Sequence, residues 1–225
     1  PYTTLFRSSQ ITDLEPFKLA FNKVLILYKK LIENGHNIIN LDLGGGIGIS
    51  YGENFTPFDI NDYADLIKEK FGSLACKLIF EPGRYITANA GILLTKVIRN
   101  KESYNNNFLI VDAAMNDILR PALYDAYHEV ITVVEKKKEQ EVIDYQVVGP
   151  ICETGDIICR KASLSNIKDG DLLAVKYAGA YGAVMSSSYN SRDLVPEIMI
   201  SSNKINIIRK RILIEDLISY ENILD

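Results

Sequence analysis

The sequence predicts two parts of different fold class, an α/β segment over residues 1–90 and an antiparallel β domain, sandwich or barrel, over residues 91–225. In the first part helix-like and strand-like runs alternate, and a polar loop follows each strand-like run. In the second part short β-prone runs are separated by Gly, Asn and Asp. The length of 225 residues corresponds to about one and a half average domains, which fits one large and one small unit or a piece of a larger protein.

Two helices, each followed by a short strand, are expected before residue 90. Apolar residues at steps of three and four predict a helix over residues 13–34, with Asp13 as its N-cap and Gly35 as its end. A second helix is expected over residues 60–71. The two strands are expected at 38–43 and 77–80.

Eight short strands are expected after residue 90, because each β-prone run is bounded by turn residues. They are predicted at 92–98, 108–111, 129–134, 142–148, 156–160, 172–177, 197–200 and 205–208. A short helix is expected at 214–220. We interpret the charged run 135–141 as a solvated hairpin tip with no function of its own.

Composition and charge exclude several classes of protein. Lys plus Arg number 25 and Asp plus Glu number 29, so the formal net charge is −4 and the chain lacks the basic excess of a nucleic-acid binder. No apolar run approaches the ~20 residues that cross a bilayer, so no membrane segment is expected. Three cysteines cannot all pair, and neither they nor the two histidines have metal-ligand spacing, which predicts a cytoplasmic protein without disulfides or metal.

Three consecutive glycines, Gly44, Gly45 and Gly46, follow the first expected strand directly. Glycines let the backbone approach a ligand closely and turn its N–H groups toward an anion such as a phosphate. A tight turn without a ligand is the simpler interpretation. No Gly-Lys-Ser/Thr sequence follows, which excludes a nucleotide-binding P-loop.

A carboxylate and a guanidinium, Glu81 and Arg84, lie just past the second expected strand in the segment Glu-Pro-Gly-Arg. Barrel enzymes keep their active-site groups at the carboxyl ends of parallel strands. The alternative is a local ion pair between Glu81 and Arg84 within a turn.

A possible carboxylate-binding group lies in the expected β domain. Arg120 and Tyr124 are four residues apart around a proline, and Asp112 precedes them. The forked donor of an arginine beside a tyrosine hydroxyl suits a carboxylate ligand. The alternative is a surface ion pair.

Cys152 and Glu153 follow a Gly-Pro turn, and Tyr181 lies between small residues. A small buried cysteine beside a solvated glutamate would be the ordinary interpretation of the first pair. Tyr181 is expected to face a ligand rather than to pack in the core. Cys76 and Cys159 have no such context, and we interpret both as core residues.

In their order along the chain, these motifs resemble those of the diaminopimelate decarboxylases. These are fold-type III enzymes that use pyridoxal 5′-phosphate and are related to ornithine and arginine decarboxylases. The resemblance runs from about Ser9 to the end of the chain, and its motifs lie at 41–46, 81–84, 119–124, 149–153 and 179–182. It implies that residues 1–90 belong to the C-terminal half of a (β/α)8 barrel that binds the cofactor, and that residues 91–225 form a C-terminal β domain with a closing helix.

The resemblance also implies which residues bind the cofactor. The loop 44–46 and Gly83 hold its phosphate through backbone N–H groups, and Glu81 faces its pyridine nitrogen. Arg84 and Tyr181 contribute to the same site.

The implied reaction is decarboxylation of meso-2,6-diaminopimelate to L-lysine, the last step of lysine biosynthesis. Arg84, Arg120 and Tyr124 bind the distal carboxylate of the substrate, which Tyr181 also contacts. Cys152 is implied as the acid that protonates Cα, and Glu153 holds the distal ammonium. In this family the last two reach the active site of the other subunit, so the working unit is a homodimer.

Two features depart from the family pattern. The lysine to which the family attaches its cofactor lies on the first barrel strand, and no lysine of this sequence has that context, so we expect the 225-residue chain to be inactive alone. Phe6 stands where the family has a histidine, and the match begins abruptly at Ser9, so we interpret residues 1–8 as non-native.

Two other functions stay open. One is a decarboxylase for ornithine, arginine or a carboxylated polyamine. Glu153 disfavours ornithine, because those enzymes have an aspartate after the cysteine, and Arg120 favours a substrate with a distal carboxylate. The other is a non-catalytic homologue that only dimerises, which the retained Cys152, Glu81 and Arg84 disfavour.

Overall fold

The computed structural model describes residues 9–52, 56–104, 106–134 and 141–222. The interpretations of Phe6, of residues 1–8 and of most of the charged run 135–141 concern residues outside this description. The chain divides into two compact units, Pro1–Ala88 and Asn89–Asp225, each of which is described by itself.

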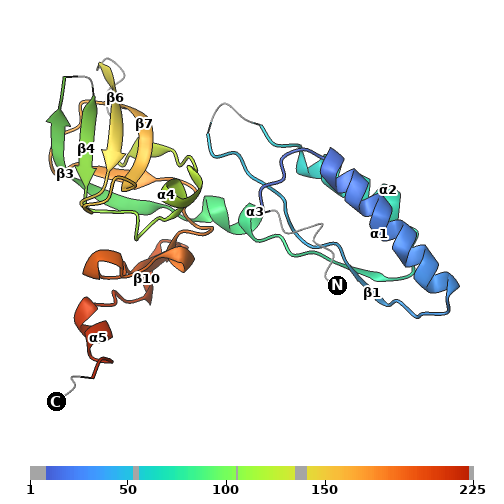
Figure 1. The fold of residues 1–225 in the computed structure, drawn as a ribbon. Helices are drawn as coiled ribbons and strands as arrows, with labels where there is room; N and C mark the ends of the chain where they lie inside the picture. The colour runs from blue at the N-terminus through green and yellow to red at the C-terminus, as the bar shows by residue number, and fades with distance from the viewer. Residues whose placement is uncertain (1–8, 53–55, 105, 135–140, 223–225) are drawn as a thin grey trace. The chain divides into compact units, whose positions relative to one another are not determined.

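The first unit contains two helices, α1 and α2, that pack against each other, and two short parallel strands, β1 and β2 (Figure 1). Its elements are α1 (Glu15–Glu33), β1 (Asn40–Asp42), α2 (Ile60–Phe71), β2 (Lys77–Ile79) and α3 (Arg84–Thr87), and the 3-10 turn η2 (Ala88–Ala90) spans the boundary of the units. The helix α2 has its predicted bounds, and the side chain of Asp59 caps it by accepting from Asn61 N–H.

The predicted start of α1 is wrong by one residue. The N-cap is Leu14 rather than Asp13, although the Asp13 carboxylate accepts a hydrogen bond from Glu15 N–H at 3.0 Å. Gly35 has φ +81°, which agrees with its predicted role at the end of this helix. Both strands are shorter than predicted, because the β1–β2 ladder pairs only Asn40–Asp42 with Lys77–Ile79.

Apolar and aromatic side chains of the two helices form the core of the first unit with residues that follow β1. The cluster comprises Phe17, Phe21, Leu43, Ile47, Tyr63, Leu66 and Phe71. Tyr63 is buried among these rings, at 4.9 Å from Phe17 and 5.9 Å from Phe21 between centroids. Its hydroxyl has no hydrogen-bond partner among the described residues.

The Tyr63→Phe variant removes a buried hydroxyl that has no partner among the described residues. At neutral pH its free energy of unfolding is therefore expected to exceed that of the parent by up to about 1 kcal/mol, as measured by urea denaturation. Burial raises the pKa of Tyr63 to about 12, above its ordinary value of about 10. The folded state thus disfavours the ionised tyrosine. Because Tyr63 ionises in the unfolded chain from about pH 10, the free energy of unfolding of the parent falls as the pH rises from about 10 to about 12. The difference in free energy of unfolding between variant and parent should widen over that interval. A variant less stable than the parent at both pH 7 and pH 11 would contradict the view that the Tyr63 hydroxyl is buried without a partner.

The second unit is built on a six-stranded mixed sheet in the order β5-β8-β3-β4-β6-β7, together with a separate hairpin. Its strands are β3 (Leu93–Glu102), β4 (Asn107–Val111), β5 (Val130–Thr132), β6 (Val142–Val148), β7 (Ile157–Ser165), β8 (Leu172–Val175), β9 (Glu197–Ser201) and β10 (Lys204–Arg209). Its helices and 3-10 turns are α4 (Arg120–Tyr124), η3 (Ala183–Met185), η4 (Tyr189–Ser191) and α5 (Ile214–Ile218).

The prediction of an antiparallel domain is wrong at one pair of strands, since β4 and β6 run parallel (Figure 1). The chain between them passes through α4 and β5 instead of a hairpin turn, and this longer connection lets β6 enter in the same direction as β4. The terminal strands β5 and β7 contact each other, so the sheet curls toward a barrel. Its interior is apolar and includes Val97, Leu109, Val147 and Leu173, all fully buried.

Candidate functional site

The glycine loop and Glu81 lie at the same edge of the two-stranded sheet in the first unit. The loop 44–46 follows β1, and the segment that begins at Phe80 follows β2. Glu81 N–H donates to the Gly44 carbonyl at 2.8 Å, and the side chain of Asp42 accepts from Gly44 N–H at 2.8 Å. The first of these bonds places the backbone of the exposed residue Glu81 next to a loop whose Gly44 and Gly46 have positive φ of 72° and 96°.

Gly45 is the position where this loop tolerates no side chain. A Cβ there would lie 2.1 Å from the carbonyl oxygen of Glu81, whereas a Cβ on Gly83 would meet nothing within 4 Å. The Gly45→Ala variant is therefore expected to displace the segment of Glu81 and to lower the melting temperature of the chain by several degrees. The matched variant Gly83→Ala should melt within about 2 °C of the parent, and equal effects of the two would show that the close approach at Gly45 is not required.

Arg84 is a buried arginine, 8% exposed, at the start of α3. Its guanidinium donates to the Ser9 carbonyl at 2.5 Å, to the Ser9 hydroxyl at 2.6 Å and to the Tyr51 hydroxyl, and its carbon lies 5.6 Å from the centre of the Tyr51 ring. Arg84 thus ties together two segments that the sequence analysis did not connect with Glu81. These contacts differ from the simple turn ion pair that was the alternative.

Arg120 begins α4 in the second unit and is 7% exposed, so the surface ion pair considered for it is wrong. Its Nη1 lies 2.7 Å from Nε2 of His128, which is completely buried. Tyr124, at the other end of this short helix, is 63% exposed. The carboxylate of Asp112, which the sequence placed with Arg120 and Tyr124, accepts from the Thr95 hydroxyl at 2.7 Å.

Cys152 and Glu153 are both exposed, on the turn that joins β6 to β7. The buried-hydrophobe interpretation of Cys152 is therefore wrong. Cys159, by contrast, is buried on β7 as predicted, and burial raises the pKa of its thiol. Cys76 is only half-buried.

A buried carboxylate, Asp156, holds this turn in place. It is 3% exposed, and its two oxygens accept from Met115 N–H at 2.7 Å and from Ile151 N–H at 2.8 Å. A Cβ on Gly149 would lie 2.3 Å from the carboxylate, so only glycine fits there. Asp156 therefore holds the turn that carries Cys152 and Glu153 by a hydrogen bond from Ile151 N–H and by close packing against Gly149.

Replacement of Asp156 with alanine is expected to lower the free energy of unfolding by about 2–4 kcal/mol, because two backbone N–H groups lose the buried carboxylate that accepts from them. The Asp156→Asn variant keeps one acceptor oxygen and should lose about half as much. Urea denaturation of the three chains measures the difference. Equal stability of the alanine variant and the parent would show that the two hydrogen bonds to Asp156 do not stabilise the turn.

Tyr189 is a contact of Glu153 that no pattern in the sequence indicates. Its hydroxyl donates to Glu153 Oε2 at 3.1 Å across 36 residues of sequence. This hydrogen bond and the charge of Glu153 raise the pKa of Tyr189, and Cys152 adds a smaller effect in the same direction. Cys152, Glu153 and Tyr189 therefore form one exposed group, which we name the turn cluster.

A second network anchors the chain on both sides of Tyr189, at Ser187 and at Arg192. Arg192 donates to Asn116 Oδ1 at 2.9 Å and to the Asp112 carbonyl at 2.5 Å, and Asn116 donates to the Ser187 carbonyl at 3.0 Å. Burial raises the pKa of the adjacent Asp117, although a hydrogen bond from Ala114 and the charge of Arg192 oppose that shift. Hydrogen bonds thus hold both segments of the turn cluster, the turn with Cys152 and Glu153 and the segment with Tyr189.

Tyr181 lies in the segment between β8 and η3 and is half-buried. Its φ of +59° and the φ of +61° at Tyr177 are unusual for tyrosine, so the surrounding contacts hold this segment in a strained conformation. Gly91 and Gly179 approach closely here, since a Cβ on Gly91 would lie 2.6 Å from Gly179 Cα.

The family model described as "Pyridoxal-dependent decarboxylase, C-terminal sheet domain" matches residues 24–179. The chain belongs to this family of pyridoxal-dependent decarboxylases. It is 50% identical over 214 residues to a diaminopimelate decarboxylase of Zymomonas mobilis, across 95% of this chain and 50% of the relative. It is 44% identical over 203 residues to that of Aquifex aeolicus, across 90% of this chain and 48% of the relative. The chain therefore spans about half the length of the curated relatives it matches.

Solved structures of family members agree with this assignment. A diaminopimelate decarboxylase of Helicobacter pylori complexed with L-lysine matches with a TM-score of 0.87 and 42% identity, over 94% of this chain and 52% of that one. A diaminopimelate decarboxylase of M. jannaschii in complex with L-lysine matches with a TM-score of 0.88 and 36% identity, over 97% and 51%. The resemblance to this decarboxylase family in the sequence is confirmed.

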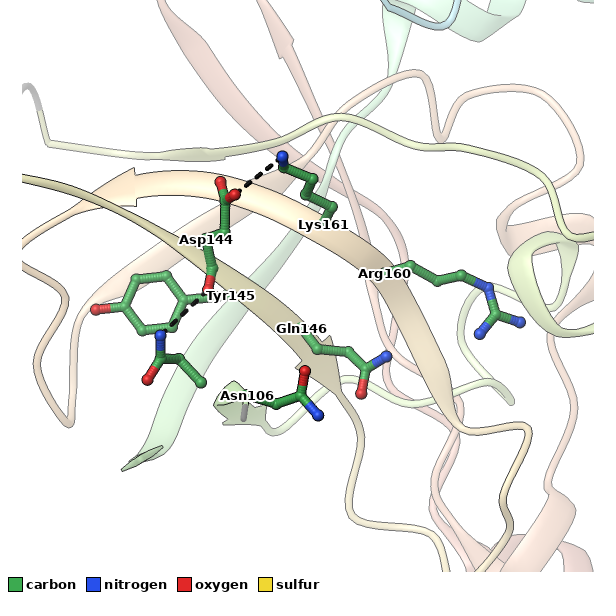
Figure 2. Close-up of a pocket in the computed structure, with 7 residues that line it drawn as sticks. Asn106, Asp144, Tyr145, Gln146, Arg160 and Lys161 are labelled. Atoms are coloured by element: carbon green, nitrogen blue, oxygen red, sulfur yellow. Dashed lines mark hydrogen bonds and ion pairs between the residues drawn. The ribbon is translucent and has the colours of Figure 1, made fainter. Parts of the chain in front are cut away.

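A surface cavity of about 340 Å³ in the second unit has no predicted site residue in its lining (Figure 2). It is lined by Asn106, Asn107, Asp144, Tyr145, Gln146, Arg160 and Lys161. The cations at this cavity already have partners, since Lys161 pairs with Asp144 at 2.9 Å and Arg160 with Asp125 at 2.9 Å. Nothing about it indicates a ligand.

Over the described residues, no helix has the length and apolar character needed to cross a membrane. In the same part of the chain, no group of three or more His, Cys, Asp or Glu side chains is arranged to hold a metal ion.

Proposed function

We propose that this chain forms the C-terminal part of a diaminopimelate decarboxylase, which releases CO2 from meso-2,6-diaminopimelate and leaves L-lysine. The observation that carries the proposal is the 50% identity to a curated diaminopimelate decarboxylase across 95% of this chain. The proposal also explains why relatives were solved with L-lysine, which would be the product.

The first unit would bind pyridoxal 5′-phosphate as part of a (β/α)8 barrel. When bound, this cofactor takes up the electron pair that remains after CO2 leaves. The residues fit it: Gly44, Gly45 and Gly46 offer a backbone without side chains, and Glu81 holds an exposed carboxylate beside them that can pair with a pyridinium nitrogen. Gly83 and Arg84 would complete this site with Tyr181.

The substrate carries an amino acid group at each end, so the enzyme must recognise the distal end in order to decarboxylate the other. Arg84, Arg120 and Tyr124 would bind the distal carboxylate, because guanidinium groups bind carboxylates with charge-assisted hydrogen bonds. Glu153 would bind the distal ammonium, and Tyr181 would contact the substrate.

Cys152 would deliver the proton to Cα after CO2 has left. A proton donor to a bound ligand must be accessible and held in place. Cys152 is exposed, and a hydrogen bond from the neighbouring Ile151 N–H to Asp156 holds its turn. We further propose that Cys152 and Glu153 serve the active site of a second subunit, so that the working enzyme is a homodimer with shared sites.

Two alternatives receive less support. A decarboxylase for arginine and one for lysine and ornithine share the fold at only 22% and 23% identity. A purely dimerising homologue would not need the hydrogen bonds of the buried Asp156 and of Tyr189 that hold an exposed cysteine and glutamate in place.

The test is genetic complementation with a chimera, in which this chain replaces the corresponding half of the Zymomonas mobilis relative. The chimera is expected to restore growth without lysine to a bacterium that lacks diaminopimelate decarboxylase. A chimera that folds and binds pyridoxal phosphate yet neither restores growth nor forms lysine would contradict the proposal.

A further inference from the structure

The buried histidine of the second unit lies between two segments to which we assign substrate contacts. His128 is completely buried. Its Nε2 lies 2.7 Å from Arg120 Nη1, and its Nδ1 lies 2.8 Å from the carbonyl oxygen of Lys176. Arg120 begins α4, whereas Lys176 begins the segment that leads to Tyr181.

These two contacts determine the protonation of the ring. A guanidinium can only donate, so Nε2 must accept from Arg120 and cannot carry a proton. A carbonyl can only accept, so Nδ1 must carry a proton and donate a hydrogen bond to the Lys176 carbonyl. His128 is thus a neutral imidazole with its proton on Nδ1.

The residue whose carbonyl accepts this hydrogen bond is itself held by further contacts. Lys176 N–H donates to the Glu129 carbonyl at 2.8 Å, and Lys176 Nζ pairs with the Glu129 carboxylate at 2.6 Å. The Tyr177 hydroxyl donates to the same carboxylate at 3.3 Å. The histidine therefore links Arg120 to a fixed point rather than to a mobile loop.

We propose that His128 is a positioning residue for substrate binding: as the neutral Nδ1–H tautomer, it aims the guanidinium of Arg120 and ties it to the segment of Tyr181. The tautomer follows from the contacts alone. The consequence for substrate rests on the proposed function, in which Arg120 binds the distal carboxylate. Orienting an arginine in advance lowers the cost of ordering it when the carboxylate arrives.

The tautomer can be tested without any enzyme activity. The chain has two histidines, His36 and His128, so nitrogen-15 NMR of the histidine-labelled chain gives two ring systems, assigned with the His36→Gln variant. His128 is expected to show a protonated Nδ1 and an unprotonated Nε2 at neutral pH, whereas the exposed His36 serves as the internal reference. A His128 signal that is charged, protonated on Nε2 or indistinguishable from that of His36 would overturn the proposal.

Two matched variants in the chimera test the positioning role. In His128→Gln the side-chain oxygen can reach the place of Nε2 and still accept from Arg120, whereas in His128→Asn the amide can replace only the Nδ1 donor. The asparagine variant should raise KM for meso-diaminopimelate about tenfold or more with kcat within about threefold, and the glutamine variant should keep KM within about threefold.

Equal KM values in the two variants, or losses confined to kcat and melting temperature, would show that His128 is only structural. If the unsubstituted chimera does not act on meso-diaminopimelate, the proposed function fails, and the NMR result still decides whether the tautomer is correct.

Discussion

Replacement of Cys152 with alanine in the chimera is expected to lower kcat about 10²–10⁴-fold, because general acids contribute about that much to proton transfer. Affinity for pyridoxal phosphate should change little, since Cys152 is not among the residues that we propose to bind the cofactor. Cys152 is exposed, so its truncation leaves no cavity and stability should also be retained. Cys159→Ala, at the buried cysteine, is the matched control and should destabilise the protein more while lowering kcat less.

A mixture of two inactive chimeras tests whether Cys152 acts in the partner subunit. One carries Cys152→Ala and the other lacks the lysine that holds the cofactor. If the sites are shared, random assortment in a twofold dimer restores about a quarter of the unsubstituted activity. No recovery after demonstrated exchange of subunits would place Cys152 at its own barrel or outside the chemistry.

The Glu153→Gln variant should lose about 2–4 kcal/mol of transition-state binding for meso-diaminopimelate, which is about 30-fold or more in kcat/KM. The reason is the loss of the negative charge that would face the distal ammonium. Tyr189→Phe removes the hydroxyl that donates to Glu153 and keeps the carboxylate, so it should cost much less. A loss below about threefold in Glu153→Gln would refute the assignment of Glu153 to the ammonium.

Local signals in the sequence predicted many elements well. The bounds of α2 (Ile60–Phe71) were predictable because the periodicity and the ends of the helix are local. The strand β6 (Val142–Val148) was predicted with its exact ends for a similar reason, as turn residues bound a β-prone run. The helix α4 (Arg120–Tyr124) was missed, because five residues around a proline carry no helical period.

Features that depend on distant residues could not be predicted. The parallel pairing of β4 with β6 depends on the path of the chain between them. The hydrogen bond from Tyr189 to Glu153 and the contact of His128 with Lys176 join residues 36 and 48 positions apart. Likewise, the burial of Arg120 follows from the packing of its helix and left no pattern in the sequence.

The central claim is that this chain helps an enzyme to recognise the distal carboxylate and ammonium of diaminopimelate. The most direct measurement is the ratio of kcat/KM for meso-diaminopimelate to that for D-lysine, which has the same configuration at the reacting carbon and the distal ammonium but lacks the distal carboxylate. A site that pairs a buried arginine with that carboxylate should favour meso-diaminopimelate by about 10³-fold or more, and Arg120→Ala should abolish most of that preference. Comparable turnover of the two substrates by the unsubstituted chimera would contradict the claim.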